Sequence, residues 1–355
     1  MAEEPEHEEA AMRRRRLRTV AAALGFDELR VAAVTGPAAQ AGRFLKWLED
    51  GAHGSMNWLA KEPGRRVDPR EVLPGCRSVI SVALNYLPPE TNHPLREGAR
   101  GKFARYAHGD DYHGIMEARL RDLAAEVEAL GGTHRYYVDT GPVLERDWAS
   151  AAGLGWNGKS TVQIHRRLGT WFFLGEILTT LVVAPDEASR DHCGNCTRCM
   201  LACPTQAITA PHRMDARRCL SYLTIEHKGS IPEEFRRALG DRIYGCDDCL
   251  EVCPWNRFAV ASREQAFAAR PFVHGWLLRE FLELNDAGFR ELFRWSPVKR
   301  IGRPAFLRNV CVALGNVGGQ DDLAALRRAA EDPDPLIAEH ARWALAEVEA
   351  RLRSQ

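Results

Sequence analysis

The sequence has no long hydrophobic run and no excess of charge of either sign. Its most apolar stretch, residues 171–184, is shorter than the roughly 20 residues that a membrane helix needs, and Glu176 interrupts it. Lysine plus arginine and aspartate plus glutamate number 48 each, so the formal net charge is +0 at pH 7. The N-terminus lacks the apolar segment of a secretory signal. These absences predict a soluble, cytoplasmic protein without a membrane partner, in which any nucleic-acid binding depends on a local basic patch.

The chain divides into three parts by composition. Residues 1–190 alternate helical and strand-like patterns, with an amphipathic segment at 43–59, a helix expected at 112–130 and strands at 78–84, 161–165 and 171–183. Residues 191–262 are rich in cysteine and turns and have little apolar sequence, so bound metal should order them. Residues 263–355 have helical patterns. We therefore predict an α+β fold with a helical C-terminal part.

The C-terminal part contains an internal repeat. Pro304, Ala313 and Leu314 recur 31 residues later, as Pro335, Ala344 and Leu345. This spacing is typical of a short HEAT-type helical repeat, and so few repeats rarely bury enough surface to stand alone. We expect the segment to pack on the preceding domain. At the other end of the chain, the acidic residues 3–9 and the arginines at 13–16 are expected to form a solvated tail.

Eight of the ten cysteines lie between residues 193 and 253. The first four form C-x₂-C-x₂-C-x₃-C-P, the run of bacterial ferredoxins, in which three thiolates hold one cubane and the fourth binds the other. A second run, C-x₂-C-x₃-C-P, ends at Cys253, and Cys219 supplies the cysteine that it lacks. The spacing predicts two 4Fe-4S clusters, one held by Cys193, Cys196, Cys199 and Cys253, the other by Cys203, Cys219, Cys246 and Cys249.

Two other uses of these cysteines fit less well. Zinc usually takes two separated C-x₂-C pairs without a third cysteine or the trailing prolines, and a chain of this size does not need disulfides. Cys76 and Cys311 lie outside the pattern, where the role of a small buried hydrophobe is expected.

Two short motifs point toward cofactors. Residues 153–160 match the P-loop pattern, but a helix-like segment precedes them and a strand-like one follows, the reverse of a phosphate-binding loop. We expect a glycine-lined wall for another cofactor. Asp111 and His113 begin the D-x-H-x-x-G signature of histidine-ligated cobalamin, but Met116 replaces the glycine, so no histidine ligand to cobalt is expected.

The motifs occur in an order that resembles one family, the epoxyqueuosine reductases. They are the two cysteine runs, R-Y-A-H-G-D-D-Y-H at 105–113, V-D-T-G-P-V-L-E-R at 138–146, the glycine segment at 153–160, C-P-W-N at 253–256 and the HEAT-like tail. The resemblance implies a cobalamin-dependent oxidoreductase that reduces epoxyqueuosine to queuosine at the wobble position of tRNA. Electrons would pass from an external low-potential donor through two 4Fe-4S clusters to cobalamin. The enzyme is expected to act as a monomer that binds one tRNA.

The resemblance also assigns domains and residues. Residues 1–190 would be the cobalamin-binding catalytic domain, 191–262 the ferredoxin-like domain and 263–355 the tRNA-binding region. Asp139 would protonate the leaving oxygen, kept protonated by burial above cofactor and substrate. The cobalamin contacts that it implies are Arg66, Tyr106, His108, Asp111, Tyr112, His113, Asp139, Asn157, Lys159, Ser160, Gln163 and Ser221.

A basic segment independently favours RNA binding. Residues 290–308 carry six cationic side chains against one glutamate, with Phe293, Trp295 and Phe306 interleaved, a composition suited to phosphates and unpaired bases. A plain solvated helix face is the alternative. The predicted tRNA contacts are Lys228, Arg294, Lys299, Arg300, Arg303 and Arg308.

Two rival functions share part of this evidence. A non-catalytic electron-transfer or tRNA-binding protein would explain the cysteines and the basic segment but leave residues 1–190 without a role. A reductive dehalogenase would share the clusters and cobalamin, but a twin-arginine signal followed by an apolar segment is not found, and the basic tail would be unexplained.

Overall fold

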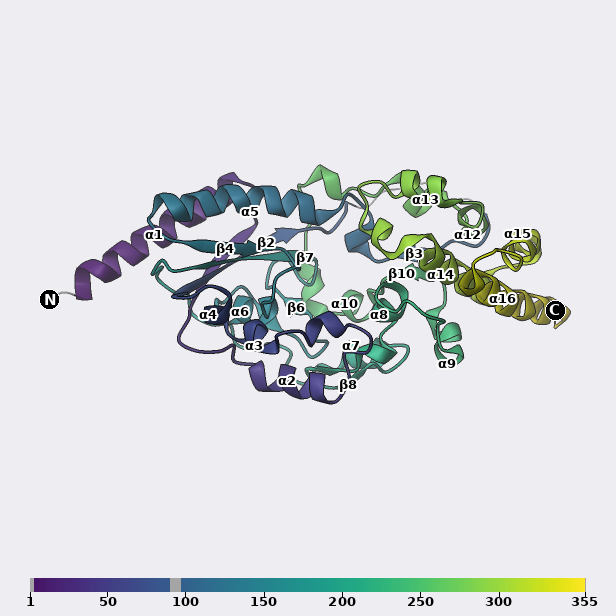
Figure 1. Cartoon of the computed structure of the whole chain (residues 1–355), viewed down its shortest axis with the longest axis horizontal. Helices are drawn as coiled ribbons and strands as arrows, with labels where there is room; N and C mark the ends of the chain where they lie inside the picture. Colours follow the sequence, from purple (N-terminus) through teal and green to yellow (C-terminus); the bar gives the residue numbers. More distant parts are fainter. Residues whose placement is uncertain (1–2, 90–96, 355) are drawn as a thin grey trace.

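The computed structural model describes residues 3–89 and 97–354 (Figure 1). Its N-terminal half is built on a four-stranded sheet in the order β1-β2-β7-β4, in which every neighbouring pair is antiparallel. The two central strands are buried along almost their whole length. The mixed helix and sheet content is as predicted. The strands are β1 (Glu28–Ala33), β2 (Ser78–Asn85), β4 (His134–Tyr137) and β7 (Phe172–Thr179).

Helices cover both faces of this sheet. Helices α1 (Glu3–Ala23) and α5 (Tyr112–Ala129) lie together on one face, where their apolar side chains share a core with Ile80 and Ile177 (Figure 1). Helices α4 (Pro69–Val72) and α6 (Glu145–Ala151) contribute to a second core on the other face. The predicted helix at 112–130 and the strands in 78–84 and 171–183 are confirmed.

The N-terminal segment is part of the fold, so the expectation of a solvated tail was wrong. In α1, Leu17 is buried, and Arg14 and Arg18 both form ion pairs with Asp186, at 3.1 and 2.6 Å. The arginines are spaced one helical turn apart, which brings both to the same carboxylate. In the helix, the apolar residues lie on the face that packs on the core, and Arg14 and Arg18 lie on the face that meets Asp186. The run of like charges in the sequence does not indicate this arrangement.

Shorter elements link the sheet to the rest of the chain. The amphipathic pattern predicted at 43–59 is helical only in α2, and the strand expected at 161–165 contains the two residues of β6. These linking elements are α2 (Ala41–Glu49), α3 (Pro63–Val67), β3 (Lys102–Phe103), β5 (Trp156–Asn157) and β6 (Gln163–Ile164).

The cysteine-rich segment has only short elements and a small apolar core, which it shares with Val312 of the C-terminal part and with Trp47 and Met56 of the N-terminal part. Strand β10 pairs in parallel with β3, so the segment is also tied to the N-terminal half through main-chain bonds. Its elements are α7 (Arg198–Ala202), β8 (Ile208–Ala210), β9 (Arg213–Met214), α8 (Leu220–Ile225), α9 (Glu233–Arg236), β10 (Arg242–Tyr244) and α10 (Asp248–Glu251).

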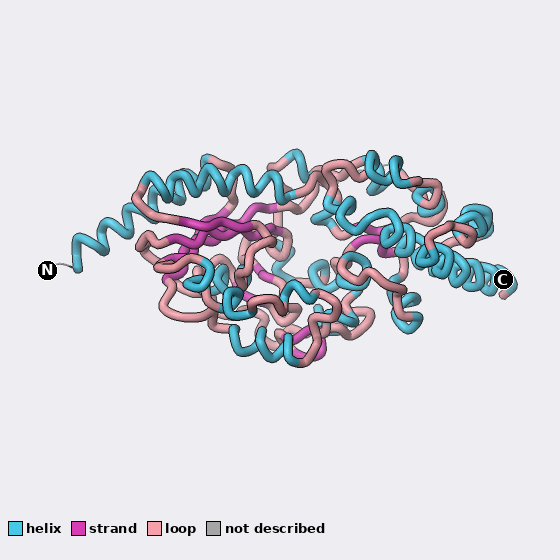
Figure 2. The backbone as a smooth tube through the Cα atoms, viewed as in Figure 1, coloured by secondary structure: helices cyan, strands magenta, loops and turns pink. Residues whose placement is uncertain are grey.

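The C-terminal part is helical and packs on the preceding region, as predicted (Figure 2). Its core includes Phe103 of β3 and Tyr244 of β10, so one apolar cluster crosses both predicted domain boundaries. These boundaries and the HEAT-type repeat stay predictions. Within the described residues, no helix is long and apolar enough to span a bilayer. The helices are α11 (Pro271–Gly275), α12 (Leu278–Phe281), α13 (Asp286–Leu292), α14 (Gly302–Val317), α15 (Leu323–Ala329) and α16 (Pro335–Arg353).

Candidate active site and cysteine groups

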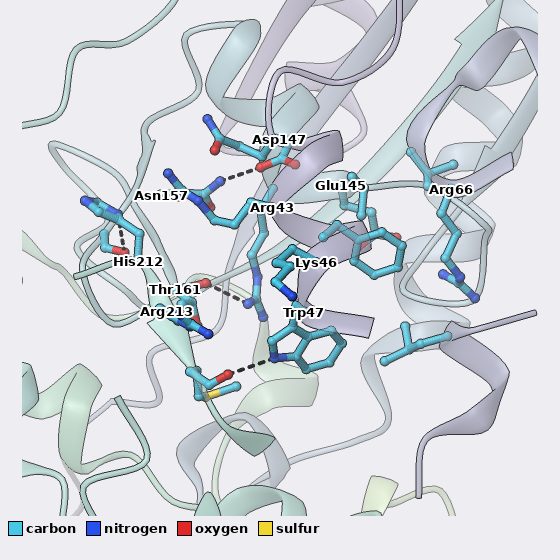
Figure 3. Close-up of a pocket in the computed structure, with 18 of the residues that line it drawn as sticks. Arg43, Lys46, Trp47, Arg66, Glu145, Asp147, Asn157, Thr161, His212 and Arg213 are labelled. Carbon is cyan, nitrogen blue, oxygen red and sulfur yellow. Dashed lines mark hydrogen bonds between the residues drawn. The ribbon is translucent and has the colours of Figure 1, made fainter. Parts of the chain in front are cut away.

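A cavity of about 630 Å³ lies between the N-terminal half and the hairpin β8–β9 of the cysteine-rich segment (Figure 3). Phe44 and Trp47 of α2 line one wall, and the indole Nε1 of Trp47 donates a hydrogen bond to the carbonyl of Met214 at 2.7 Å. None of the α2 side chains is buried. The apolar face that makes this helix amphipathic therefore borders the cavity instead of a core, a role that its sequence pattern alone could not indicate.

The cavity combines apolar walls with converging polar groups, the usual composition of a cofactor site. The guanidinium of Arg66 lies 5.1 Å from the ring of Trp58 and donates to the carbonyl of Gly141 at 3.2 Å. Its Nε and the Oδ1 of Asn157 are buried and have no hydrogen-bond partner among the described residues. Such groups fit a ligand that brings its own polar atoms. The charged lining residues are Arg43, Lys46, Asp50, Arg66, Asp139, Glu145, Arg146, Asp147 and Arg213.

Asp139 lies on the cavity just after β4, in a left-handed backbone conformation with φ of 58°. Its Oδ2 accepts a hydrogen bond from the Tyr112 hydroxyl at 2.9 Å, and its backbone N–H donates to Oε1 of Glu145 at 2.8 Å. Non-glycine residues held in this region of φ cost energy and often occur at functional sites. The side chain is exposed to the cavity, so any burial of Asp139 would come from bound molecules.

Two further carboxyl groups on the cavity are perturbed, and the sequence did not single them out. Burial, with the nearby Asp139 charge, raises the pKa of Glu145 to about 8. Burial also raises the pKa of Asp147 to about 6, although Asn157 donates to its Oδ1 at 2.8 Å. The wall near Asp139 therefore holds protons at a pH where ordinary carboxyl groups are ionised.

The structure brings together only some of the predicted cobalamin contacts. Arg66, Asp139 and Asn157 line the cavity, and Tyr112 reaches it through Asp139. The others lie outside its lining: Tyr106 packs between Tyr112 and Tyr244, Gln163 is buried against Ser150, Ser221 lies on α8, and Lys159 and Ser160 border the cysteines.

Three of the predicted contacts have partners elsewhere. His108 lines a separate cavity beside Cys246, and its Nε2 faces the carbonyl of Phe103 at 3.1 Å. Asp111 and His113 interact with Arg300. Burial opposes ionisation of Asp111, but hydrogen bonds from His113 and the Arg300 charge lower its pKa to about 2. Asp111 and His113 therefore connect the basic segment to α5. Neither these two residues nor His108 lines the Asp139 cavity.

The glycine segment at 153–160 lacks the geometry of a phosphate loop. It follows α6 and leads into the short pair β5–β6, so no helix begins after it. The Nζ of Lys159 donates to the carbonyls of Gly194 and Cys196, at 2.5 and 3.1 Å, and Gly158 lines the Asp139 cavity. The segment is therefore a wall shared by the cavity and the first cysteine run, and its expected role in binding another cofactor stays a prediction.

The cysteines gather in two groups. Cys193, Cys196, Cys199 and Cys253 line a cavity of about 210 Å³, although the last is more than fifty residues away in sequence. The thiols of the first three act together on the pKa of Cys253, which burial raises. Cys249 also borders this cavity, but the sulfurs that raise its pKa, after burial, are those of Cys219, Cys246 and Cys203. The grouping is the one that an exchange of ligands between the two runs requires, and the assignment of each cysteine to a cluster stays a prediction.

The donor set suits iron–sulfur clusters. Burial raises the pKa of Cys246 to about 12, so a thiolate at this position needs the positive charge of bound metal. Among the described residues, no three His, Cys, Asp or Glu side chains converge on the position of one metal ion. The first group instead surrounds a larger space, as a cubane requires. Cys76 and Cys311 are buried apart from both groups, as expected.

The basic segment is exposed only in part. Trp295 is 70% exposed, and Arg294, Lys299 and Arg300 reach the surface. Lys228 is exposed as well. Phe293 and Phe306 are buried in the C-terminal core, so they cannot stack on bases in this fold.

Two of the predicted tRNA contacts, Arg308 and Arg303, are largely buried among structural partners. Arg308 is 0% exposed, and it donates to the carbonyls of Leu223, His227 and Gly229, so its prediction as a tRNA contact was wrong. Arg303 is mostly buried and binds Asp332 at 2.6 Å. The sequence shows the charge of an arginine but not the side of the helix on which neighbouring segments pack.

Comparisons with known proteins match this arrangement. A family model described as a 4Fe-4S double cluster binding domain matches residues 192–256, and one described as Epoxyqueuosine reductase QueG matches residues 66–140. The epoxyqueuosine reductase of Xanthomonas campestris is 44% identical over 338 residues, which cover 94% of this chain and 95% of the relative. That of Escherichia coli is 41% identical over 305 residues, covering 85% of this chain and 80% of the relative.

Solved structures agree over nearly the full length. A crystal structure of epoxyqueuosine reductase with an epoxyqueuosine-modified tRNA-Tyr stem loop has a TM-score of 0.88 at 29% identity, covering 94% of this chain and 89% of that chain. An epoxyqueuosine reductase from Bacillus subtilis, with its catalytic aspartate loop swung out of the active site, has a TM-score of 0.86 at 29% identity and covers 94% of this chain and 90% of that chain.

Proposed function

The chain belongs to the epoxyqueuosine reductase family, and on this premise we propose that the Asp139 cavity holds cobalamin and the epoxyqueuosine base of a tRNA. It is an oxidoreductase that reduces epoxyqueuosine, and its cysteine-rich segment is a double 4Fe-4S domain. The observation that carries the proposal is the shared wall at Gly158 and Lys159. This wall borders the Asp139 cavity on one side and the first cysteine group on the other.

The chain's own residues would bind and orient the two molecules. Arg66 and Asn157 offer unpartnered buried polar atoms to the cofactor, and the apolar face of α2 excludes water from the same wall. Cobalamin, when bound, supplies a strongly reducing cobalt centre to the epoxide carbon. The two cysteine groups would bind the clusters that take single electrons from an external low-potential donor.

Asp139 would supply the proton that the leaving oxygen needs. Conversion of an epoxide to an alkene and water consumes two electrons and two protons, and breaking the carbon–oxygen bond is easier when the oxygen is protonated. Tyr112 donates to Oδ2 of Asp139, which leaves Oδ1 as the oxygen that would carry the proton. The position of Asp139 on the cavity supports this role.

The exposed part of the basic segment would hold the tRNA. Arg294, Lys299 and the 70% exposed Trp295 lie on one segment, and Arg300 connects that segment to Asp111 at the start of α5. The backbone N–H of Asp111 also donates to the carbonyl of Trp295 at 2.7 Å. These contacts fix the basic surface relative to the domain that carries Asp139. We propose that one chain binds one anticodon stem loop.

The test is single turnover of the cobalamin- and cluster-loaded protein with an epoxyqueuosine-containing stem loop, read by mass spectrometry of the nucleoside. Asp139→Asn should slow oxygen loss by about 100-fold or more while iron and cobalamin contents stay unchanged. Asp122→Asn, on the exposed surface of α5, is the matched control. An Asp139→Asn protein that turns over at the normal rate would remove this residue as the proton donor.

A further inference from the structure

A fully buried glutamate lies below the Asp139 loop and takes no part in the mechanism described so far. Glu176 is 0% exposed, in the middle of β7, opposite Ser81 on β2 and Tyr137 on β4. Neither of its carboxyl oxygens meets an N–H or O–H donor among the described residues. An isolated charge in such a place is costly, so this carboxyl group requires a partner or a proton.

The partner is the carboxyl group of Glu145, at the start of α6. The two carboxyl groups interact directly: Glu145 raises the pKa of Glu176, whereas the hydrogen bond from Glu176 lowers the pKa of Glu145, so the proton is placed on Glu176. Two carboxyl groups can form a hydrogen bond only when one of them is protonated. Burial, the neighbouring carboxyl group and the charge of Asp139 raise the pKa of Glu176 far above its ordinary value. Near neutral pH, the pair therefore keeps a proton between its members.

Glu145 connects this proton to the proposed catalytic loop. Its Oε1 accepts the backbone N–H of Asp139 at 2.8 Å, the residue whose φ of 58° is costly for a non-glycine side chain. This bond offsets part of a strain that is typically about 1–3 kcal/mol. In the Bacillus subtilis relative, the loop that carries the catalytic aspartate is swung out of the active site. If the Asp139 loop can move in the same way, a contact is needed to hold Asp139 at the cavity.

We propose that Glu145 and Glu176 share one proton and act as a positioning pair that holds the Asp139 loop against the cavity. The inference rests on the proposed role of Asp139. When the pair loses its proton, two adjacent carboxylates repel each other. Glu145, whose side chain is partly exposed, can relieve the repulsion by turning toward solvent, and its bond to the Asp139 N–H is then lost. The loop would be released as the pH rises.

Other charged and titratable groups surround the pair on the elements packed against it. Arg66 of α3 and Arg146 of α6 favour ionised carboxyl groups, whereas Asp139 opposes them. Tyr112 of α5 contacts Asp139, Tyr137 of β4 lies beside Glu176, and Asp147 faces Asn157. Asp139 is itself the proposed proton donor. Variants must therefore remove the shared proton while leaving Asp139 in place.

Glu176→Gln meets that need because its amide N–H₂ can donate permanently to Glu145, as the protonated acid would. In single-turnover assays on the loaded enzyme with the modified stem loop, the wild-type rate should fall on the alkaline side. The Glu176→Gln rate should stay close to wild type at neutral pH, and its alkaline fall should disappear or move by one pH unit or more. Glu145→Ala, which removes the acceptor of the Asp139 N–H, should be slower by tenfold or more at every pH. An unchanged alkaline fall in Glu176→Gln would overturn the proposal.

A second readout does not depend on turnover. Difference infrared spectra of the cluster-loaded protein should show a protonated carboxyl band that is lost at alkaline pH. The band should be missing from Glu176→Gln and shifted in frequency in Glu145→Gln, where the buried Glu176 keeps its proton but faces an amide. The exposed control Glu117→Gln should keep the band unchanged. A band that stays unchanged in both variants would overturn the proposal even if rates changed. If Asp139→Asn remains active but the band behaves as expected, the proposed proton donor fails while the carboxyl pair stands.

Discussion

Replacing Arg308 by methionine tests whether this arginine holds the fold together or contacts RNA. The side chain is 0% exposed and donates to three main-chain carbonyls at 2.7 to 2.9 Å, that of Leu223 in α8 and those of His227 and Gly229 after it. It also donates to the side chain of Asn309. Methionine keeps the volume of the aliphatic stem but leaves these acceptors without their donor.

The expected cost follows from this geometry. Removing one member of a buried charged network typically costs about 3–5 kcal/mol, because the remaining polar groups stay buried without partners. Total stabilities are commonly about 5–15 kcal/mol, so a loss of this size should lower the unfolding temperature clearly. Burial lowers the pKa of Arg308 to about 10, which still leaves it charged at neutral pH.

The assay is thermal unfolding of the cluster-loaded variants without oxygen, combined with stem-loop affinity at several salt concentrations. Arg308→Met should unfold at lower temperature and bind with a normal salt dependence wherever it is folded. Arg294→Met, whose side chain is 60% exposed, should change stability by about 0.5 kcal/mol at most. Normal unfolding of Arg308→Met together with a weaker salt dependence would refute the structural role and restore the RNA contact.

Two further predictions concern the surface and the clusters. Lys299→Met should weaken stem-loop binding and reduce the slope of log affinity against log salt by about 1, because it removes one phosphate contact; an unchanged slope would place Lys299 outside the interface. Cys253→Ser should damage the same cluster as Cys193→Ser, seen as the same missing signal in electron paramagnetic resonance and about half the iron. If its spectrum instead matches that of Cys203→Ser, the exchange of ligands between the two runs is wrong.

The cysteine groups could be predicted from the sequence because their ligands lie in short runs with a fixed spacing. Three cysteines of one short run surround one cubane, so their grouping follows from local spacing. Only Cys203, Cys219 and Cys253 had to be assigned to a cluster whose other ligands are distant in the sequence. The cavity is different. Trp47 and Met214, which are 167 residues apart, meet there through one hydrogen bond. No local pattern records that meeting, so α2 could be identified as amphipathic but not as a cavity wall.

The roles of charged residues were the hardest features to predict from the sequence. Lys299 and Arg308 look alike in the sequence, yet one is exposed and the other is enclosed by the segment after α8. The sequence shows that Glu176 interrupts an apolar strand. Its proposed role depends on Glu145, which lies on a different element, α6. Burial is decided by tertiary packing, so a charged residue's role follows only when the neighbouring elements are placed.

The glycines of residues 153–160 show why a motif can match by letters and differ in physics. A side chain at Gly155, which has φ of 130°, would place its Cβ 2.1 Å from the carbonyl oxygen of Ile164, and one at Gly158 would lie 2.5 Å from the Ile164 side chain. The glycines are therefore required by close packing of β5 against β6, without any phosphate. The lysine that follows holds the first cysteine run through the carbonyls of Gly194 and Cys196. Residues 153–160 therefore form a wall with the first cysteine group on one side. The cavity in which reduction is proposed to occur lies on the other side.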